Sequence, residues 1–332
     1  MKRYLAVAVT TVFFLIFMTV MVFFLLYRDT SSEREMLTSG DNPDGSLLFT
    51  ENAEEIIEEE EPVPGREDYF CIPIPEGTKA SDISIDDSPL DGMTLVSIPI
   101  KEESYYYKHN LSGTRKGIRE IGFSILDGKV IFEIHTDGVR VLSSESDDRF
   151  LYVRYDSPRE IYDRIILIDP GHGGADTGSE AYGVCEKDIA LGIAGRIEDF
   201  GEDRTGIFFT RTDDSSVPAS DREEYVKKLD PDLLITLHTN ADGSTRITRG
   251  VEVYYNKDEL KEPAEKLAED LLRISGTSGK KVMKEKKIPG FEGTDVPVIM
   301  IKTGYITNRS EAWLMAGEEY EEKAARAIEE MF

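Results

Sequence analysis

The chain has 332 residues and a formal net charge of −26 at pH 7. This length accommodates a domain with a sizeable core, a smaller module and unstructured connections. Binding to nucleic-acid phosphates requires lysine and arginine gathered on one face, and we find no such run in this acidic chain. We therefore predict two folded units and no nucleic-acid partner.

The N-terminal segment is apolar. Leu5–Tyr27 is an uncharged run of about 23 residues, long enough to cross a hydrocarbon core about 30 Å thick. A cleavable signal peptide is the alternative, but its apolar region would be shorter and 28–30 lacks a small-residue cleavage site. Because Lys2 and Arg3 precede the run and acidic residues follow it, the N-terminus is expected to be cytoplasmic. We predict a single-pass cell-membrane anchor over 1–28, with all later residues extracytoplasmic.

An acidic segment follows the anchor. Residues Ser31–Asp68 contain thirteen acidic and two basic side chains, with few aromatic residues and no lasting periodicity. Such a segment repels itself and cannot bury a core. A role in binding cations or a basic partner is the alternative, although charge runs are more often solvated spacers. We assign 29–80 as a disordered linker.

Short runs of β-forming residues follow the linker, separated by Gly, Asp and Ser turns. They include Thr94–Ile100, Lys129–His135 and Phe150–Tyr155, and they predict a small, mostly antiparallel β-rich module over 81–160. The tyrosines at 105–107 are candidates for a sugar-stacking platform, but packing in a core or an interface is the favoured interpretation.

Strands alternate with helices in the C-terminal half, 161–332. The segments predicted as strands are Ile165–Asp169, Gly206–Thr210, Leu233–Leu237, Val251–Tyr255 and Val296–Ile301. Helical spacing joins Ile189, Ile193, Ala194, Ile197 and Phe200, and further helices are expected at Asp221–Leu229, at Pro263–Ile274 and before Phe332. This alternation predicts an α/β domain with a mostly parallel sheet and helices on both faces, where ligands bind at the carboxyl ends of strands.

Three candidate metal ligands follow these strand ends. His172 lies in a glycine-rich turn directly after the first strand, and His238 ends the strand that begins at Leu233. Glu186 begins the intervening helix, where the helix dipole favours a carboxylate. Two imidazoles and one carboxylate are the set typical of catalytic zinc, with the fourth position open to water. The other histidines, His109 and His135, fall in the β-rich module.

The two cysteines do not add to this site. Cys71 and Cys185 are far apart in the sequence and form no CxxC motif, and a disulfide between them is left open. Cys185 immediately precedes Glu186, but adjacent residues at a helix start point in different directions. We therefore exclude Cys185 from the ligand set.

Several ordered motifs in about half of the chain, from Arg164 onward, resemble a known family. They are IILIDPGHGGADTG, the glutamate of CEKDIALGIA, FFTRTDD, DLLITLHTNA, GVEVYY and PVIMIKTGYITNRSEAWL. The segment is similar to the zinc-dependent N-acetylmuramoyl-L-alanine amidases (the amidase 3 type), hydrolases that cleave peptidoglycan in the cell wall. The resemblance implies Zn²⁺ held by His172, Glu186 and His238, and hydrolysis of the amide between N-acetylmuramic acid and L-alanine.

One position departs from the family pattern. The family carries a glutamate, the expected general base, where this chain has Lys302 in the sequence IKTGY. An ammonium group has no lone pair and repels a dication, so it needs a strongly depressed pKa to act as a base. A displaced carboxylate can substitute, zinc-bound hydroxide alone can give slow turnover, or the domain binds the wall without cutting it. Glu252 is the first substitute to inspect, although a solvated strand residue explains it equally well.

These observations leave three classes of function. The leading hypothesis is a zinc amidase that acts on peptidoglycan, and the alternative is an amidase-fold protein that binds wall or regulates other hydrolases. A purely structural envelope protein is the least favoured, because it does not explain the histidine–glutamate set. Arg211 and Asp213 also match the family pattern, and a surface ion pair is the expected role for them.

Overall fold

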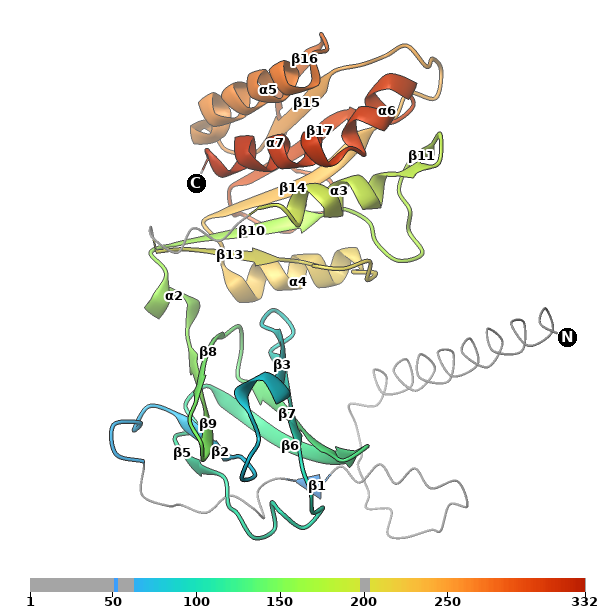
Figure 1. Ribbon diagram of the computed structural model, residues 1–332. Coiled ribbons are helices and arrows are strands. Elements are labelled where there is room, and N and C mark those ends of the chain that lie inside the picture. Colours follow the sequence, from blue (N-terminus) through green and yellow to red (C-terminus); the bar gives the residue numbers. More distant parts are fainter. Residues whose placement is uncertain (1–50, 53–62, 198–203, 332) are drawn as a thin grey trace, which may run out of the picture. The chain divides into compact units, whose positions relative to one another are not determined.

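The computed structural model describes residues 51–52, 63–197 and 204–331 (Figure 1). The predicted membrane anchor, Leu5–Tyr27, and most of the acidic linker lie outside the described residues. Within the described ranges, no helix is long and apolar enough to cross a membrane. Membrane anchoring therefore stays a prediction.

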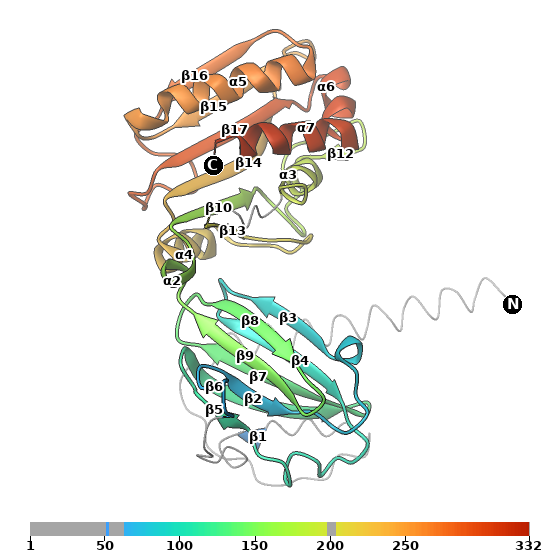
Figure 2. The same ribbon diagram turned by 60° about the vertical axis from the view of Figure 1, so that its left-hand side comes forward.

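The β-rich module consists of antiparallel strands, as the sequence predicts (Figure 2). The strands are β1 (Glu51–Asn52), β2 (Phe70–Pro73), β3 (Ser84–Ser88), β4 (Met93–Pro99), β5 (Ser112–Gly113), β6 (Ile118–Leu126), β7 (Lys129–Thr136), β8 (Val141–Ser146) and β9 (Phe150–Asp156). One sheet has the order β1-β6-β7-β4-β3 and the other the order β5-β2-β9-β8. Alternate residues of the strands form a single apolar core.

The consecutive tyrosines at 105–107 differ in burial. Tyr106 is buried, donates a hydrogen bond to the carbonyl of Pro73 at 2.8 Å and packs edge-on against Phe132. Tyr107, in contrast, is 52% exposed. The favoured interpretation, core packing, therefore holds for Tyr106.

The boundary between linker and module lies earlier than predicted. Strand β2 is buried and pairs with both β5 and β9, so at least residues 70–73 belong to the module rather than to a linker that ends at residue 80. Strand β1, also inside the predicted linker, pairs with β6. The prediction followed the charge of the preceding residues and overlooked the short apolar run in β2. Cys71, in this strand, and Cys185 are both free thiols.

The C-terminal domain is an α/β domain, as predicted. Its main sheet has the order β13-β10-β14-β17-β15-β16, and every neighbouring pair is parallel except β15 and β17. These strands are β10 (Arg164–Pro170), β13 (Thr205–Phe209), β14 (Leu233–Asn240), β15 (Val251–Tyr255), β16 (Lys280–Lys284) and β17 (Val298–Tyr305). A hairpin of β11 (Glu180–Ala181) and β12 (Val184–Cys185) lies outside that sheet. The helices are α2 (Pro158–Ile161), α3 (Glu186–Ala194), α4 (Ala219–Leu229), α5 (Lys261–Ser275), α6 (Arg309–Met315) and α7 (Glu318–Glu329).

Helices cover both faces of this sheet (Figure 1). In β10, Ile166 and Ile168 face one core with α3, α5 and α7, while Ile165 and Leu167 face a second core with α4. Because both faces are buried, the central strands are continuous apolar runs. Strand β16, which was not predicted, is an edge strand whose lysines interrupt the apolar pattern. The parallel pairing of β10, β14 and β17 brings their carboxyl ends to one edge of the sheet.

The position of β2 in the module can be tested with Ile72→Ala. Ile72 has no exposed surface, so truncation is expected to cost about 2–5 kcal/mol of local stability. Amide hydrogen exchange should speed up in the neighbouring strand β9. Ile247→Ala is the matched control, because Ile247 is 82% exposed and its loss should change stability by less than about 0.5 kcal/mol. Equal exchange in the two variants would contradict the placement of β2 in the core.

Candidate metal centre

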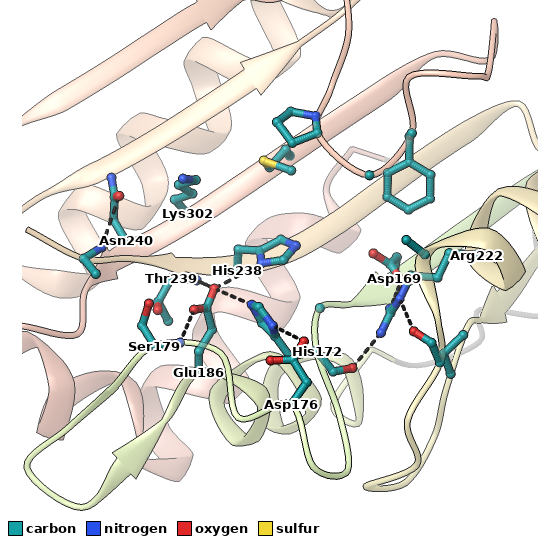
Figure 3. Close-up of a pocket in the computed structure, with 18 residues that line it drawn as sticks. Asp169, His172, Asp176, Ser179, Glu186, Arg222, His238, Thr239, Asn240 and Lys302 are labelled. Atoms are coloured by element: carbon teal, nitrogen blue, oxygen red, sulfur yellow. Dashed lines mark hydrogen bonds and ion pairs between the residues drawn. The ribbon is translucent and has the colours of Figure 1, made fainter.

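Three side chains converge at the carboxyl edge of the sheet (Figure 3). His172 follows β10, Glu186 begins α3, and His238 lies near the end of β14. One ligand atom from each lies within 4.8 Å of the other two. Glu186 Oε1 is 3.3 Å from His172 Nε2 and 3.0 Å from His238 Nδ1. The structure therefore brings together all three residues that the sequence analysis selected.

Glu186 is held in the ionised form that a metal ligand requires. Its side chain is buried, and its oxygens accept backbone hydrogen bonds from Ser179 N and Thr239 N, each at 2.9 Å. Burial acts to raise the pKa of Glu186, but hydrogen bonds to His172 and His238 and to the two amides outweigh it and lower the pKa. The start of α3 adds a favourable dipole.

His172 is oriented by a second carboxylate. Asp176 Oδ2 lies 2.9 Å from His172 Nδ1, which leaves Nε2 directed toward Glu186. Metal-bound histidines commonly have such a partner on the second ring nitrogen, because it fixes the tautomer and the ring plane. Glu186, and then Asp176, raise the pKa of His172 against the opposing effect of burial. The backbone of His172 has φ of 61°, a left-handed conformation that is uncommon for a non-glycine residue.

Two glycines leave space for the imidazoles. A Cβ at Gly171 would lie 2.3 Å from Cε1 of His238, and a Cβ at Gly178 would lie 2.6 Å from Cδ2 of His172. Neither contact is sterically tolerable without movement of the ring. Gly171 does not have a positive φ, so its role is close approach to His238 rather than the tight turn that the sequence suggested.

Two buried arginines hold the backbone of the loop after β10. Arg222 donates to the carbonyls of Pro170 and His172 at 3.0 and 2.6 Å, and Arg211 donates to the carbonyls of Pro170 and Gly171 at 3.0 and 2.9 Å. Both arginines are less than 10% exposed. Arg211 and Arg222, which we call the arginine clamp, thereby fix three successive carbonyls. This keeps His172 in its unusual backbone conformation.

The expectation of a surface ion pair between Arg211 and Asp213 is wrong. Arg211 is buried, and it contacts Asp213 through the backbone carbonyl of that residue at 2.8 Å. Burial lowers the pKa of Arg211, and the neighbouring Arg222 adds to this effect. The Arg211 guanidinium donates hydrogen bonds to carbonyls of the loop. This role has no recognisable pattern in the sequence.

Asp169 supplies the negative charge beneath the loop. It is 1% exposed, pairs with Arg222, and accepts hydrogen bonds from the hydroxyls of Thr210 and Thr236, both at 2.7 Å. A buried charge pair of this kind is costly to break, because the remaining charge has no partner. Asp169 and Arg222 were not predicted from the sequence as functional residues. The available signal was a carboxylate that ends an otherwise apolar strand.

Lys302 lines the same cavity as the three candidate ligands (Figure 3). In the sheet it pairs with His238 on one side and with Glu252 on the other. Its ammonium lies 5.8 Å from the ring centroid of Tyr254. The lysine therefore occupies the wall of the candidate site, one strand away from a proposed metal ligand.

Glu252 is placed differently from a general base. Among the described residues, those that line the cavity do not include it. Its oxygens accept hydrogen bonds from the hydroxyls of Tyr254 and Tyr305, the second at 2.9 Å. Burial acts to raise the pKa of Glu252, but these hydroxyls and Lys281 lower it. Glu252 therefore lies on the far side of β17 from the candidate ligands, although its side chain also contacts that of Asn240, which lines the cavity.

The Asp169–Arg222 pair can be tested by unfolding. Arg222→Leu leaves Asp169 buried without its cation and should cost about 3–5 kcal/mol. Urea unfolding of the metal-free protein can be followed through Trp313, the only tryptophan of the chain. Lys228→Leu, in the same helix, is the control: Lys228 forms an exposed ion pair with Glu224 at 2.8 Å, worth at most about 1 kcal/mol. A similar loss of unfolding free energy in both variants would contradict the role assigned to the Asp169–Arg222 pair.

Comparison with known proteins agrees with the motifs. The family model described as N-acetylmuramoyl-L-alanine amidase matches residues 166–331. The germination-specific N-acetylmuramoyl-L-alanine amidase of Bacillus subtilis is 30% identical, over 50% of this chain and 76% of its own. The uncharacterized Bacillus subtilis protein YqiI is 30% identical, over 50% of this chain and 81% of its own. A crystal structure of an N-acetylmuramoyl-L-alanine amidase from Clostridium difficile is 26% identical and covers 50% of this chain and 92% of its own, with a TM-score of 0.46. The chain therefore belongs to the N-acetylmuramoyl-L-alanine amidase family.

Proposed function

We propose that the protein acts on peptidoglycan at a single zinc ion held by His172, Glu186 and His238, and hydrolyses the amide between N-acetylmuramic acid and L-alanine. The observation that carries this proposal is the convergence of two imidazoles and one buried carboxylate within 4.8 Å. This donor set suits zinc and leaves a coordination position for water or substrate. Membership of the family supports the choice of substrate.

The chain's own residues would prepare the site for this chemistry. Zinc, when bound, supplies a Lewis acid that polarises the amide carbonyl and lowers the pKa of a bound water toward about 7. Glu186 remains anionic, Asp176 keeps Nε2 of His172 free for the metal, and Arg222 holds the carbonyl of His172. The polar groups are fixed before substrate arrives, so little reorganisation is needed.

Lys302 favours a second candidate function. All three carboxylates among the described cavity-lining residues are already engaged, since Glu186 contacts both histidines, Asp176 holds His172, and Asp169 pairs with Arg222. A general base must be able to accept a proton from water, which a protonated lysine cannot do. The second candidate is therefore an amidase-fold protein that binds wall, or regulates other hydrolases, without efficient cleavage.

We also propose that the site works outside the cytoplasm, close to the membrane. The support is the apolar run Leu5–Tyr27 with Lys2 and Arg3 before it. Peptidoglycan, the proposed substrate, lies on that side of the membrane. The acidic residues of the predicted linker would give the domain reach into the wall.

The zinc site can be tested by metal analysis. Full-length protein purified with zinc and dialysed should retain one equivalent, whereas His172→Ala should lose at least about 10-fold in affinity because it removes one of three ligands. His135→Ala is the matched control, because His135 lies in β7 of the β-rich module and contacts Glu133 instead. Equal zinc retention in both variants would contradict the assigned ligands.

The role of position 302 in hydrolysis can be tested with Lys302→Glu. Peptidoglycan incubated with the zinc-loaded protein is analysed by mass spectrometry for stem peptides with a free L-alanine amine. Because a positioned base contributes about 10²–10⁴-fold, Lys302→Glu should release these peptides much faster than the native chain. Release by the native chain that is lost in His172→Ala would support the amidase. Release by Lys302→Glu alone would favour the wall-binding candidate, and no release by either would contradict hydrolysis.

A further inference from the structure

Lys302 lines the same cavity as the three candidate metal ligands and, within the part of the chain that the structure describes, has no carboxylate partner of its own. Glu252, the register partner of Lys302, accepts hydrogen bonds from tyrosine hydroxyls on both oxygens. The ion pair of Glu252, at 3.9 Å, is with Lys281. Among the described residues no ion pair joins Lys302 to an acidic side chain. Lys302 instead lies near the ring of Tyr254 and lines the cavity. Its charge is therefore available to a ligand.

Lys302 changes the sign of the net charge of the residues that line the cavity. Of the described residues that line it, three are carboxylates (Asp169, Asp176 and Glu186) and two are cationic (Arg222 and Lys302). With a bound dication and neutral histidines, the lining has a net charge of +1. A glutamate at position 302 would make it −1. A cavity of this kind attracts anions rather than the neutral amide of the proposed reaction.

The side chain of Lys302 and a metal held by His238 would face one cavity from adjacent strands. His238 and Lys302 are register partners on adjacent parallel strands, and adjacent strands lie about 4.8 Å apart. Both side chains line the same cavity. A carboxylate has two oxygens, so one can approach the metal while the other accepts a charge-assisted hydrogen bond from the ammonium.

We infer that this site binds the free lactyl carboxylate of N-acetylmuramic acid, that is, glycan from which the peptide has been removed. The inference rests on the proposed zinc site. Cleavage of the amide leaves a carboxylate at the carbon that was the amide carbonyl, and the oxygen on that carbon is the atom that a bound metal would contact. Carboxylates of the stem peptide are the other source of the same chemistry, but they lie several bonds away from that carbon.

Binding can be measured by calorimetry with the zinc-loaded full-length protein. The probes are N-acetylmuramic acid, its neutral methylamide, and a stem pentapeptide with a free L-alanine amine. The native protein should prefer the acid over the methylamide. Lys302→Gln should weaken binding of the acid about 10- to 100-fold, the loss expected for a hydrogen bond to a charged group, and leave the methylamide unchanged. Lys302→Arg should retain the preference.

Lys281→Gln is the matched control, because Lys281 lies on β16 and, among the described residues, those lining the cavity do not include it. Its affinity for the acid should equal that of the native chain. Equal affinity of the native chain for acid and methylamide, or an unchanged Lys302→Gln, would overturn the inference. Binding of the pentapeptide that depends on Lys302 would overturn the lactyl assignment in favour of a peptide carboxylate.

Zinc content, measured on every sample, separates this inference from the proposed function. A chain that holds no zinc contradicts the proposed function and removes the basis of the inference, whereas a chain that holds zinc but binds the acid no better than the methylamide contradicts the inference alone. A chain that holds zinc and releases no stem peptide still supports the inference if it prefers the acid. If the native chain cleaves wall, N-acetylmuramic acid should inhibit that cleavage. The Lys302→Gln variant should be inhibited less.

Discussion

The candidate site depends on one buried ion pair, Asp169 with Arg222. Asp169, the second-last residue of β10, accepts hydrogen bonds from the hydroxyls of Thr210, after β13, and Thr236, in β14, so one carboxylate joins three neighbouring strands. Arg222 brings α4 to the same point and holds the carbonyl of His172. A charge pair buried this deeply contributes little net stability compared with apolar packing, but it is very costly to disrupt. What it provides is a fixed position for a loop whose backbone is not in a relaxed conformation.

The three candidate ligands are positioned by independent means. His238 belongs to a central strand, so the rigidity of the sheet fixes it, and Gly171 leaves room for its ring. His172 lies in a loop and needs both the arginine clamp and Asp176. Glu186 is buried at a helix start, where two amides bind its oxygens. Because each ligand has its own support, the set is organised before any metal arrives, which is what tight coordination requires.

Much of the fold, and the convergence of the three candidate ligands, could be predicted, because both depend on patterns that sequence preserves. Strands β10 and β14 are unbroken apolar runs, and ligands of parallel sheets follow such strands. The buried strand β2 and the lysine-rich edge strand β16 were missed, since one is very short and the other lacks the apolar pattern. The roles of Arg211 and Arg222 could not be predicted, because hydrogen bonds from a side chain to carbonyls distant in the sequence follow no regular sequence spacing. The register that places Glu252 across β17 from the candidate ligands is likewise a property of the assembled sheet.

Under the proposed function, the charge of the side chain at position 302 would divide binding from catalysis. The ligand geometry, the clamp and the second carboxylate on His172 do not involve Lys302. A glutamate there would add a proton acceptor and leave the cavity with a negative lining, which suits water activation. A lysine removes the acceptor and supplies a cation, which suits a ligand that already carries the negative charge produced by hydrolysis. The proposed metal centre would therefore suit substrate turnover with a glutamate at position 302 and product recognition with a lysine there, because this side chain sets the net charge of the cavity.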